Sequence, residues 1–357
     1  MISKKRFILK RIIDDTFGKA LFTVFSLRSK RSIPKKVNKV VIFKLSTLGD
    51  SLLSLPAIKK LKEDTGAKIV LVHSGDNKVI FENQGFIDEK IFLDVSRNNL
   101  FGFLKALFKI KKVNADFAVD LSHTGYLSAI FSMVSGKFLI GFFNPDVPLR
   151  KGFFDFEFPI GGNHMVANYF GIFSKINKKE ILGEFTLISP SVDKRARQKI
   201  EKVLRGKKNL VGVHPCHEIN EKSWSKENFA EIINYIILKG KVPVILGSPK
   251  EKPKVQKLLQ LVKNRSKILD LSGKLNVSEV FGLMKHLEFF VSNDGGIMHI
   301  SGSFGIPTLG IFSAENPKKY APYNKKSYAI DARRVSKEES LKTAKKVIDI
   351  FLKQIKK

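Results

Sequence analysis

A short strand-like run followed by an amphipathic helix recurs along most of this chain, and this alternation limits the fold more than any other feature. Residues 39–43 form a β-branched, buried-type run, and residues 50–63 then carry apolar side chains at helical spacing. The pattern restarts with a strand-like run at 210–214 and a helical one at 226–238. Parallel strands need such crossover helices, so the sequence predicts an α/β fold with two Rossmann-like, doubly wound domains.

The other predicted elements continue this order. In the first half we expect strands at 68–72, 90–93, 117–121 and 138–140, with helices at 78–83, 100–111, 126–135 and 164–176. In the second half we expect strands at 242–246, 267–269, 289–291 and 308–311, with helices at 250–263, 277–285, 296–303 and 336–356. Residues 141–162 are rich in Phe, Gly and Pro, which predicts a loop, and residues 177–190 are typical of a linker.

These elements divide the chain into four segments. A basic helical segment occupies residues 1–36, a first domain 37–176, a second domain 177–335, and a final helix 336–357. The carboxyl ends of the strands of both sheets are expected to face a central cleft, because ligands of doubly wound sheets bind at that edge.

Composition narrows the class of protein. With 357 residues and 43% hydrophobic content, the chain can build two cores. No apolar run approaches the roughly 18–20 residues that span a bilayer, and we expect neither a transmembrane helix nor a cleavable signal peptide. Cys216 is the only cysteine, which excludes an intramolecular disulfide and favours a reducing, cytoplasmic location.

Charge is the strongest global signal. The chain has 64 Lys and Arg against 33 Asp and Glu, a formal charge of +31, so nucleic acid, anionic lipid and phosphorylated substrates all qualify as partners. Lysine-rich usage also occurs without any such partner. No nucleic-acid reader motif and no arginine cluster with stacking aromatics is present, and we expect no specific nucleic-acid ligand.

The N-terminal segment concentrates this charge. Residues 1–36 contain eleven basic and two acidic side chains. One predicted helix face is apolar and comprises Ile8, Ile12, Ile13, Phe17, Leu21, Val24 and Phe25, whereas Lys4, Lys5, Arg6, Lys10, Arg11 and Lys19 occupy much of the remainder. Such a basic amphipathic helix is typical of an anionic membrane interface. The same helix would equally pack on the body of the protein, and one helix can serve both purposes.

Several ligand-binding signatures are missing. No Gly-x-Gly-x-x-Gly follows a strand, and no P-loop occurs, which argues against a dinucleotide site and a P-loop ATPase. Asp-x-Asp is absent, and the histidines lack the spacing of a zinc site. We therefore expect no cofactor and no resident metal.

Two strand-to-helix turns carry polar residues suited to chemistry. After the first strand, Ser46 and Thr47 offer hydroxyls, Gly49 permits a tight turn, and Asp50 is either a first-turn helix acid or a proton acceptor facing the cleft. After a strand of the second domain, the run Asn-Asp-Gly-Gly opens a helix. There Asp294, Gly295, Gly296 and His299 would surround a ligand held by backbone amides, although such a glycine pair is usually only a turn.

A third segment lies between them. His214, Pro215 and Cys216 end the first strand of the second domain, and Lys222 and Trp224 follow. Lys222 would supply a charge for a diphosphate, or simply be a solvated lysine. Trp224, the only tryptophan, is expected to pack this loop onto the domain.

Together the three segments resemble glycosyltransferase family 9, the lipopolysaccharide heptosyltransferases. KVVIFKLSTLGDSLLSLPAIKKLK is similar to the opening strand, loop and helix of that family, and HPCHEINEKSWSKENFAEII to its proline-containing loop with Lys-x-Trp. DLSGKLNVSEVFGLMKHLEFFVSNDGGIMHISGSFGIPTLGIF resembles its donor-site signature, and the resemblance spans residues 37–357 in the right order.

The resemblance implies a GT-B type fold and an inverting, metal-independent transfer of a sugar, heptose from an ADP-sugar, to a lipopolysaccharide-core or related bacterial surface glycan. By motif match, Asp50 takes the catalytic-base position and Lys222 the diphosphate position. Asp294, Gly295, Gly296 and His299 take donor-binding positions, and Ser46, Thr47 and Gly49 fall in the loop beside acceptor and diphosphate. Domain 37–176 would then bind a lipid-linked glycan acceptor, with residues 141–162 as a loop that faces it, and domain 177–335 the nucleotide sugar. We accordingly expect a peripheral enzyme on the inner face of the cytoplasmic membrane.

Three departures from the family pattern stand out. Gly295 replaces the usual threonine, Cys216 replaces a small residue after Pro215, and the long basic N-terminal helix has no counterpart in compact heptosyltransferases. Two other functions remain open on the sequence: a sugar-nucleotide epimerase of the same two-domain fold, which needs no acceptor, and a non-catalytic basic protein that binds nucleic acid.

Overall fold

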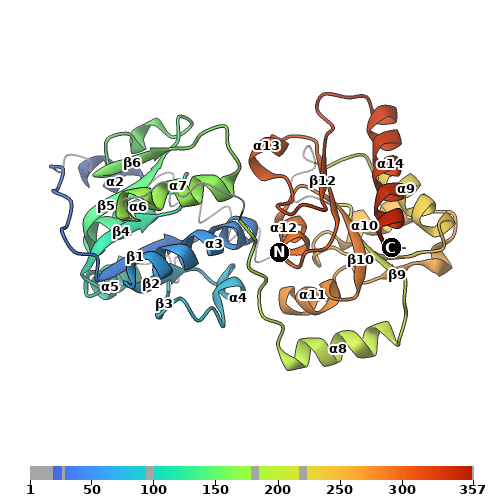
Figure 1. The fold of residues 1–357 in the computed structure, drawn as a ribbon, viewed down its shortest axis with the longest axis horizontal. Helices are drawn as coiled ribbons and strands as arrows, with labels where there is room; N and C mark the ends of the chain where they lie inside the picture. Colours follow the sequence, from blue (N-terminus) through green and yellow to red (C-terminus); the bar gives the residue numbers. More distant parts are fainter. Residues whose placement is uncertain (1–18, 26–28, 94–99, 178–184, 217–222, 356–357) are drawn as a thin grey trace. The chain divides into compact units, whose positions relative to one another are not determined.

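The computed structural model describes residues 19–25, 29–93, 100–177, 185–216 and 223–355 (Figure 1). The chain divides into two compact units, Met1–Phe185 and Thr186–Lys357. Each unit has its own parallel sheet with helices on both faces, which confirms the predicted α/β class and the two-domain organisation. Among the described residues, no helix combines the length and the apolar character needed to cross a bilayer.

The first unit is built on a parallel sheet in the order β3-β2-β1-β4-β5-β6. Its strands are β1 (Lys39–Lys44), β2 (Lys68–His73), β3 (Glu89–Phe92), β4 (Ala115–Asp120), β5 (Gly136–Phe143) and β6 (Phe156–Pro159). Central β1 pairs with β2 on one side and with β4 on the other, so that Val40 faces both Ile69 and Phe117. Residues buried on both faces of the sheet explain why these strands read as continuous apolar runs.

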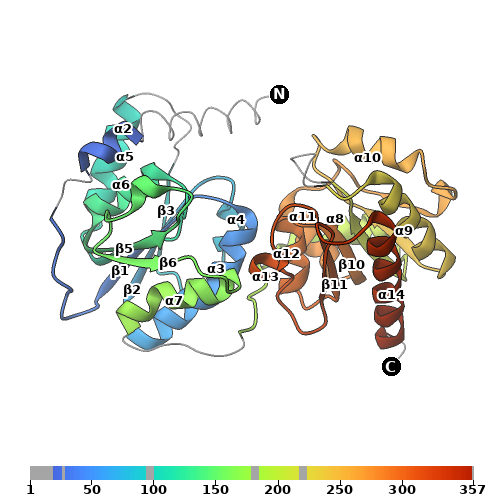
Figure 2. The same cartoon turned by 90° about the horizontal axis from the view of Figure 1, so that it is seen from above.

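Helices cover both faces of this sheet (Figures 1 and 2). One layer contains α3 (Leu48–Thr65) packed on α7 (Met165–Asn177), with the short α4 (Lys78–Phe81) beside α3. The other layer contains α2 (Lys19–Phe25), α5 (Leu100–Lys111) and α6 (Tyr126–Ser135). The predicted helix at 126–135 has these same bounds, and the predicted helix at 50–63 extends by two residues at each end.

The N-terminal helix is described only from Lys19 onward, so Ile8, Ile12, Ile13 and Phe17 of the predicted apolar face lie outside the described residues. Within α2, Phe22 is fully buried and stacks on Phe153 with ring centroids 4.2 Å apart. Val24, which belongs to the predicted apolar face, is 67% exposed. This part of the helix therefore packs on its own unit through a side chain that the predicted face did not include.

Residues 141–162 are not the uninterrupted loop that the sequence predicted. They contain the end of β5, the 3₁₀ turn η2 (Pro148–Arg150) and strand β6. The prediction was wrong because the abundance of Phe, Gly and Pro hid a periodic segment. Phe154, Phe156 and Phe158 alternate with acidic residues, which is the pattern of a strand. This stretch also supplies Arg150, which is fully buried.

The second unit repeats the same topology. Its parallel sheet has the order β12-β11-β10-β7-β8-β9. The strands are β7 (Leu210–His214), β8 (Val242–Ile245), β9 (Leu269–Asp270), β10 (Leu287–Asn293), β11 (Thr308–Phe312) and β12 (Tyr328–Asp331). Counted along the chain, both sheets follow the order 3-2-1-4-5-6.

The helices of the second unit also form two layers. A core of buried aliphatic and aromatic residues joins the sheet to α9 (Lys226–Leu238), α10 (Lys252–Leu259) and α14 (Lys337–Ile355). On the other face, α8 (Lys194–Leu204) packs on α11 (Val277–Met284), and α12 (Gly296–Ser303) packs on β10 and β11. The short elements η4 (Arg265–Lys267) and α13 (Pro317–Tyr320) complete the unit. Helix α8 and strand β12 were not predicted, since charged residues outnumber apolar ones in α8 and β12 is short.

Each sheet changes direction at one place. In the first unit the chain order reverses between β1 and β4, and in the second between β7 and β10. In open α/β sheets, ligands bind outside the carboxyl ends of the strands at such a switch point. The predicted site residues from Ser46 to Asp50 follow β1, and those from Asp294 to His299 follow β10.

Candidate functional site

In the first unit, the turn from β1 into α3 carries the predicted catalytic loop. Ser46 and Thr47 are exposed, Gly49 is buried, and Asp50 lies in the first turn of α3. Thr47 precedes the helix, and its hydroxyl donates a hydrogen bond to Asp50 Oδ2 over 3.1 Å. All four predicted loop residues therefore lie together at the switch point. A carboxylate in the first helical turn is also favoured by the helix dipole, which keeps its charge in place.

Lys44, the last residue of β1, lies directly behind this carboxylate. Its side chain is 1% exposed, and Nζ lies 4.0 Å from Asp50 Oδ2. The ammonium also donates to the carbonyl oxygen of Leu121 over 3.5 Å and lies over the Tyr169 ring. Burial lowers the pKa of Lys44, while the charges of Asp50 and Asp120 act in the opposite direction. Lys44 and Asp50 are thus neighbouring groups of opposite formal charge at the base of this turn.

Beneath the same turn, Asp120 and Arg150 form a fully buried ion pair. Arg150 Nη2 lies 3.1 Å from Asp120 Oδ2, and both side chains are 0% exposed. Ser128 Oγ donates to the same oxygen over 2.8 Å, and the Ser122 amide donates to Oδ1 over 2.9 Å. Burial pushes the pKa of Asp120 upward, against the opposing effects of Arg150 and these two hydrogen bonds.

Arg150 also ties the pair to the start of α6. Its Nη1 donates to the carbonyl oxygen of Gly125, and its guanidinium lies over the Phe154 ring at 5.1 Å. Neither Asp120 nor Arg150 was among the residues predicted for the site. A lone arginine within the apolar stretch 141–162 was the available signal, because an arginine among buried residues needs a carboxylate partner.

In the second unit, the predicted donor residues lie at the junction of β10 and α12. Asp294 and Gly296 are partly buried, and His299, one turn into α12, is buried. Gly295 precedes the helix in an extended conformation, and a Cβ atom built there would meet nothing within 4 Å. The free amides at the start of α12 therefore adjoin open space, an arrangement that suits an anionic or polar ligand.

Asn293, the last residue of β10, joins the two strands of this switch point. Its Nδ2 donates to the carbonyl oxygen of Pro215 over 2.8 Å, and its Oδ1 accepts from the Trp224 amide over 2.9 Å. Trp224 is buried, as predicted, and its indole nitrogen donates to Ser340 Oγ over 3.1 Å. One neutral amide thus contacts both Pro215 and Trp224. Asn293 was not among the residues predicted for the site.

His214 and Glu251 form a second titratable pair at the end of β7. His214 Nε2 lies 3.5 Å from Glu251 Oε2, which also accepts from the Ser248 amide over 2.7 Å. Burial alone would raise the pKa of Glu251, but His214 and the hydrogen bonds from Ser248 lower it to about 2. Cys216 next to them is buried, and burial together with the charge of Glu251 raises the pKa of its thiol to about 12.

Lys222, the predicted diphosphate ligand, lies in residues 217–222, outside the described part of the chain. Within the described residues, no group of three or more His, Cys, Asp or Glu side chains is arranged to hold a metal ion. The structure thus brings Ser46, Thr47, Gly49 and Asp50 together in one unit. It brings Asp294, Gly295, Gly296 and His299 together in the other.

Comparison with known proteins identifies the relatives of this chain. The profile described as Glycosyltransferase family 9 (heptosyltransferase) matches residues 104–348. Lipooligosaccharide heptosyltransferase 2 of Haemophilus influenzae is 24% identical over 181 residues, which are 49% of this chain and 52% of that protein. The match therefore spans only about half of that relative's length. Lipopolysaccharide heptosyltransferase 1 of Campylobacter coli is 25% identical over 295 residues, 77% of this chain and 84% of that protein.

Solved structures show the same fold. The ADP-heptose lps heptosyltransferase II of Escherichia coli aligns with a TM-score of 0.73 at 16% identity, covering 89% of this chain and 100% of that one. A UDP-GlcNAc 2-epimerase from Methanocaldococcus jannaschii aligns with a TM-score of 0.55 at 15% identity, covering 86% and 91%. The fold is shared by both enzyme types, and the alignment to the transferase is better.

Proposed function

The chain belongs to glycosyltransferase family 9, and from this premise we propose that it transfers a heptose from an ADP-sugar to a lipopolysaccharide-core or related surface-glycan acceptor. The observation that carries the proposal is the Asp50 carboxylate at the β1 switch point, hydrogen-bonded by Thr47 and backed by the buried ammonium of Lys44. A general base needs a carboxylate at the ligand-binding edge of the sheet, and the position of Asp50 after β1 supports this role.

The proposed chemistry is a single displacement with inversion. The acceptor hydroxyl gives its proton to Asp50, and its oxygen attacks the anomeric carbon from the face opposite the nucleotide. The bond between that carbon and the diphosphate oxygen breaks as the new glycosidic bond forms. Asp50 must be charged to act, and Lys44 favours that state until the proton arrives.

The second unit is proposed to hold the nucleotide sugar. The amides at the start of α12 and the space beside Gly295 would receive the donor, Asp294 would accept a hydrogen bond from a sugar hydroxyl, and His299 would lie one turn further on. Lys222 would neutralise charge on the departing diphosphate, by the motif match that assigned it. A lysine and oriented amides suit a transfer that runs without a metal ion.

The proposed donor and acceptor rest on the relatives. The name of the Escherichia coli enzyme specifies ADP-heptose, and the curated relatives are lipopolysaccharide or lipooligosaccharide heptosyltransferases. A lipid-linked acceptor would be met at the inner face of the cytoplasmic membrane. We propose that the basic N-terminal segment assists there by binding anionic lipid, although Phe22 packs on the first unit.

Transfer can be tested directly. The purified chain, ADP-heptose and a heptose-deficient lipopolysaccharide core should release ADP and yield a glycosylated core of the expected mass, in the presence of a chelator. NMR of the new linkage should show inversion at the anomeric carbon. An epimerase would change the donor without any acceptor, and a nucleic-acid binder would retain RNA at physiological salt while leaving the donor intact. Either outcome, or a strict need for a divalent ion, would contradict the proposal.

A further inference from the structure

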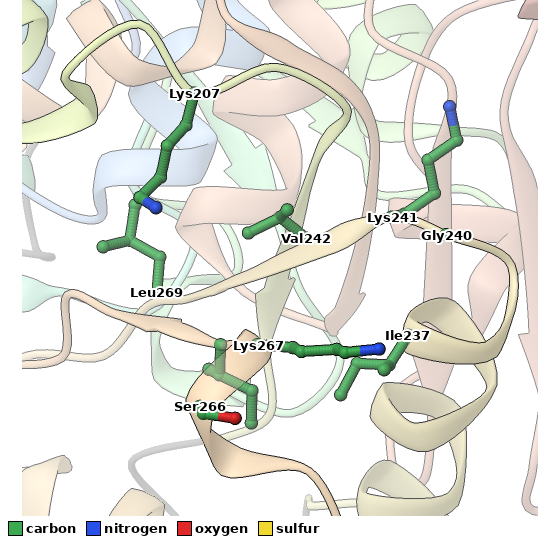
Figure 3. A pocket seen from close by; sticks show the side chains of 9 residues that line it. Lys207, Ile237, Gly240, Lys241, Val242, Ser266, Lys267 and Leu269 are labelled. Atoms are coloured by element: carbon green, nitrogen blue, oxygen red, sulfur yellow. The ribbon is translucent and has the colours of Figure 1, made fainter.

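Two adjoining hollows lie on the second unit, at the opposite end of the sheet from the donor residues. The first measures about 300 Å³ and is lined by Lys207, Lys241, Val242, Lys267 and Leu269, among others (Figure 3). These residues precede or begin β7, β8 and β9, so they mark the amino ends of the parallel strands. At ~3.3 Å per residue, strands of this length separate that edge from the carboxyl ends by roughly 15 Å. The hollow is therefore not part of the donor site.

The basic groups of the first hollow are not neutralised there. Its lining contains three lysines and no acidic residue. Lys241 is paired with Glu288 at 2.6 Å, and its amine points away from the hollow (Figure 3). Lys207 ends beside Leu269, and Lys267 reaches toward Ile237 from another segment (Figure 3). Neither Lys207 nor Lys267 has a carboxylate partner among the described residues. Two ammonium groups from separate chain segments thus border one hollow.

The second hollow extends the same positive surface. It measures about 520 Å³, shares Lys207 and Leu269 with the first, and adds Lys202 and Arg205 from the end of α8. Asp270 is the one carboxylate that lines it, and its oxygens already accept hydrogen bonds from Ser272 and Gln256. Lys202 and Arg205 likewise have no carboxylate partner among the described residues. We call Lys202, Arg205, Lys207 and Lys267 together the amino-end surface.

Exposed leucines occur in the segments that form this surface. Leu238, in the last turn of α9 next to Ile237 and Gly240, is 79% exposed. Leu261, which precedes the turn η4, is 44% exposed. The amide of Lys263 donates to Asn234 Oδ1 over 3.1 Å, and Asn234 lies one helical turn before Leu238, so the two leucine-bearing segments are in contact. Apolar side chains beside unpaired lysines are what a peripheral protein inserts among anionic headgroups.

We propose that the amino-end surface is a second membrane-docking site, separate from the N-terminal segment, which binds anionic phospholipid headgroups and inserts Leu238. The positive groups are spread over two shallow hollows instead of converging on one point, which fits many headgroups better than one phosphate. Neither lining contains an aromatic side chain on which a base could stack, which argues against single-stranded nucleic acid. The proposal does not depend on the transfer reaction.

A fluorescent label tests insertion in the full-length chain. Cys216 is buried and its thiol has a pKa raised to about 12, so a cysteine introduced as Leu238→Cys can be labelled selectively with a polarity-sensitive dye. With vesicles of phosphatidylglycerol and phosphatidylcholine, the emission should shift to shorter wavelength, and with phosphatidylcholine alone it should not. The control Lys342→Cys is exposed near the start of α14, where Ser340 bonds Trp224 at the carboxyl end of β7, and it should show no shift. An unchanged spectrum at position 238 would overturn the proposal.

Charge reversal tests the lysines. The pair Lys207→Glu and Lys267→Glu should weaken binding to the anionic vesicles by at least about tenfold, since each lysine near such a surface contributes about 1 kcal/mol. The matched pair Lys337→Glu and Lys342→Glu makes the same change in net charge at the start of α14, toward the carboxyl end of the sheet, and should have an effect within about twofold. Equal losses in both pairs would mean that only net charge matters.

Two further results would assign the surface to another ligand. Inorganic phosphate should displace the protein from vesicles no better than chloride at the same ionic strength, and a specific effect of phosphate would mean a single-phosphate site. Retention on RNA that Lys207→Glu and Lys267→Glu abolish, with vesicle binding intact, would mean a nucleic-acid surface. Sugar transfer to a detergent-solubilised acceptor should be unchanged in these variants, so a failure of docking is distinguishable from a failure of the proposed function.

Discussion

The two units share one sheet topology but stabilise their switch points by different means. In the first unit the turn rests on charged groups: Lys44 behind Asp50, and the buried pair of Asp120 and Arg150 below. In the second unit the corresponding strands are joined by the neutral amide of Asn293, and the turn opens at Gly295. Topology therefore decides where each site lies, and the side chains at the strand ends decide what it can do.

This difference agrees with the two proposed roles. A base must be charged and oriented, and a buried cation nearby serves that purpose. A diphosphate donor brings its own charge and needs oriented amides and room, which the start of α12 offers. If the comparison is right, substitutions in the first unit should affect the chemical step or the fold, and those in the second unit should affect donor binding.

The largest expected effect on catalysis follows from replacing the carboxylates of Asp50 and Asp294, one at a time, by amides. Asp50→Asn should lower kcat by about 10²–10⁴-fold, because it removes the proton acceptor. Stability should change by less than about 1 kcal/mol, since asparagine is nearly the same size. Asp294→Asn should instead raise the KM for the nucleotide sugar more than it lowers kcat. Steady-state kinetics with varied donor checks both, and near-normal turnover by Asp50→Asn would leave Asp50 as a helix-terminal acid only.

The next effect concerns the buried pair. Arg150→Met should destabilise the first unit by about 3–5 kcal/mol, because it leaves Asp120 buried without its guanidinium partner. The double variant Asp120→Asn with Arg150→Met should recover most of that loss, since both charges are then gone.

The location of the only tryptophan allows the unfolding of the two units to be measured separately. Trp224 lies in the second unit, so its fluorescence during urea unfolding reports that unit, while circular dichroism reports both. Arg150→Met should lower the circular dichroism midpoint and leave the fluorescence midpoint unchanged. A double variant as unstable as the single one would show that shape at position 150, not charge, holds the turn.

The sequence predicted the order of strands and helices more completely than it predicted the residues at the strand ends. The strand–helix order was predicted for most elements because buried parallel strands and their crossovers have distinct periodicities. Strand β6 was missed when its alternating phenylalanines were taken for a loop, and α8 was missed because few apolar residues define its buried face. Periodicity fails where an element lies at the edge of a sheet or is mostly solvated.

The site was predicted only where it is local in sequence. Asp50 and Thr47 are three residues apart, so one motif contains both, and the structure places them in contact. Asp120 and Arg150 are thirty positions apart, and Asn293 reaches residues nearly eighty positions earlier. Such partners become neighbours only through strand order, which no single motif encodes.

A smaller effect concerns how the stability of the second unit depends on pH, through Glu251. Glu251 has a pKa lowered to about 2 against an ordinary 4.5. A carboxyl with a depressed folded-state pKa stabilises the fold above its unfolded pKa, so this contribution is complete above about pH 5 and disappears as the pH falls toward 2. The shift corresponds to about 3 kcal/mol, at 1.36 kcal/mol per unit.

The variant Glu251→Gln isolates this contribution from those of other carboxyls. The free energies of unfolding, from urea curves followed by Trp224 fluorescence, should differ between wild type and variant by most of that amount at pH 6, and the difference should shrink steadily toward pH 2. A difference that stays constant with pH would mean that Glu251 acts through hydrogen-bond geometry alone. The part of the circular dichroism change that Trp224 fluorescence does not follow reports the first unit, and it should respond equally in both proteins.

The smallest effect on stability is expected at Gly295. Comparing this open position with the packed glycine Gly212 tests whether the turn before α12 has room for a side chain. Its backbone is extended, which any residue adopts, and an added Cβ meets nothing within 4 Å, so Gly295→Thr should change stability by less than about 0.5 kcal/mol. At Gly212 in β7 an added Cβ would lie 2.2 Å from the Phe290 ring, and Gly212→Thr should cost about 1–3 kcal/mol or more. The new hydroxyl at position 295 adjoins the proposed donor site, so donor affinity should rise by a few fold, the size of one net hydrogen bond of ~1 kcal/mol. Calorimetric titration with the ADP-sugar measures this, and a loss of affinity would mean that the space beside Gly295 is already filled by the donor.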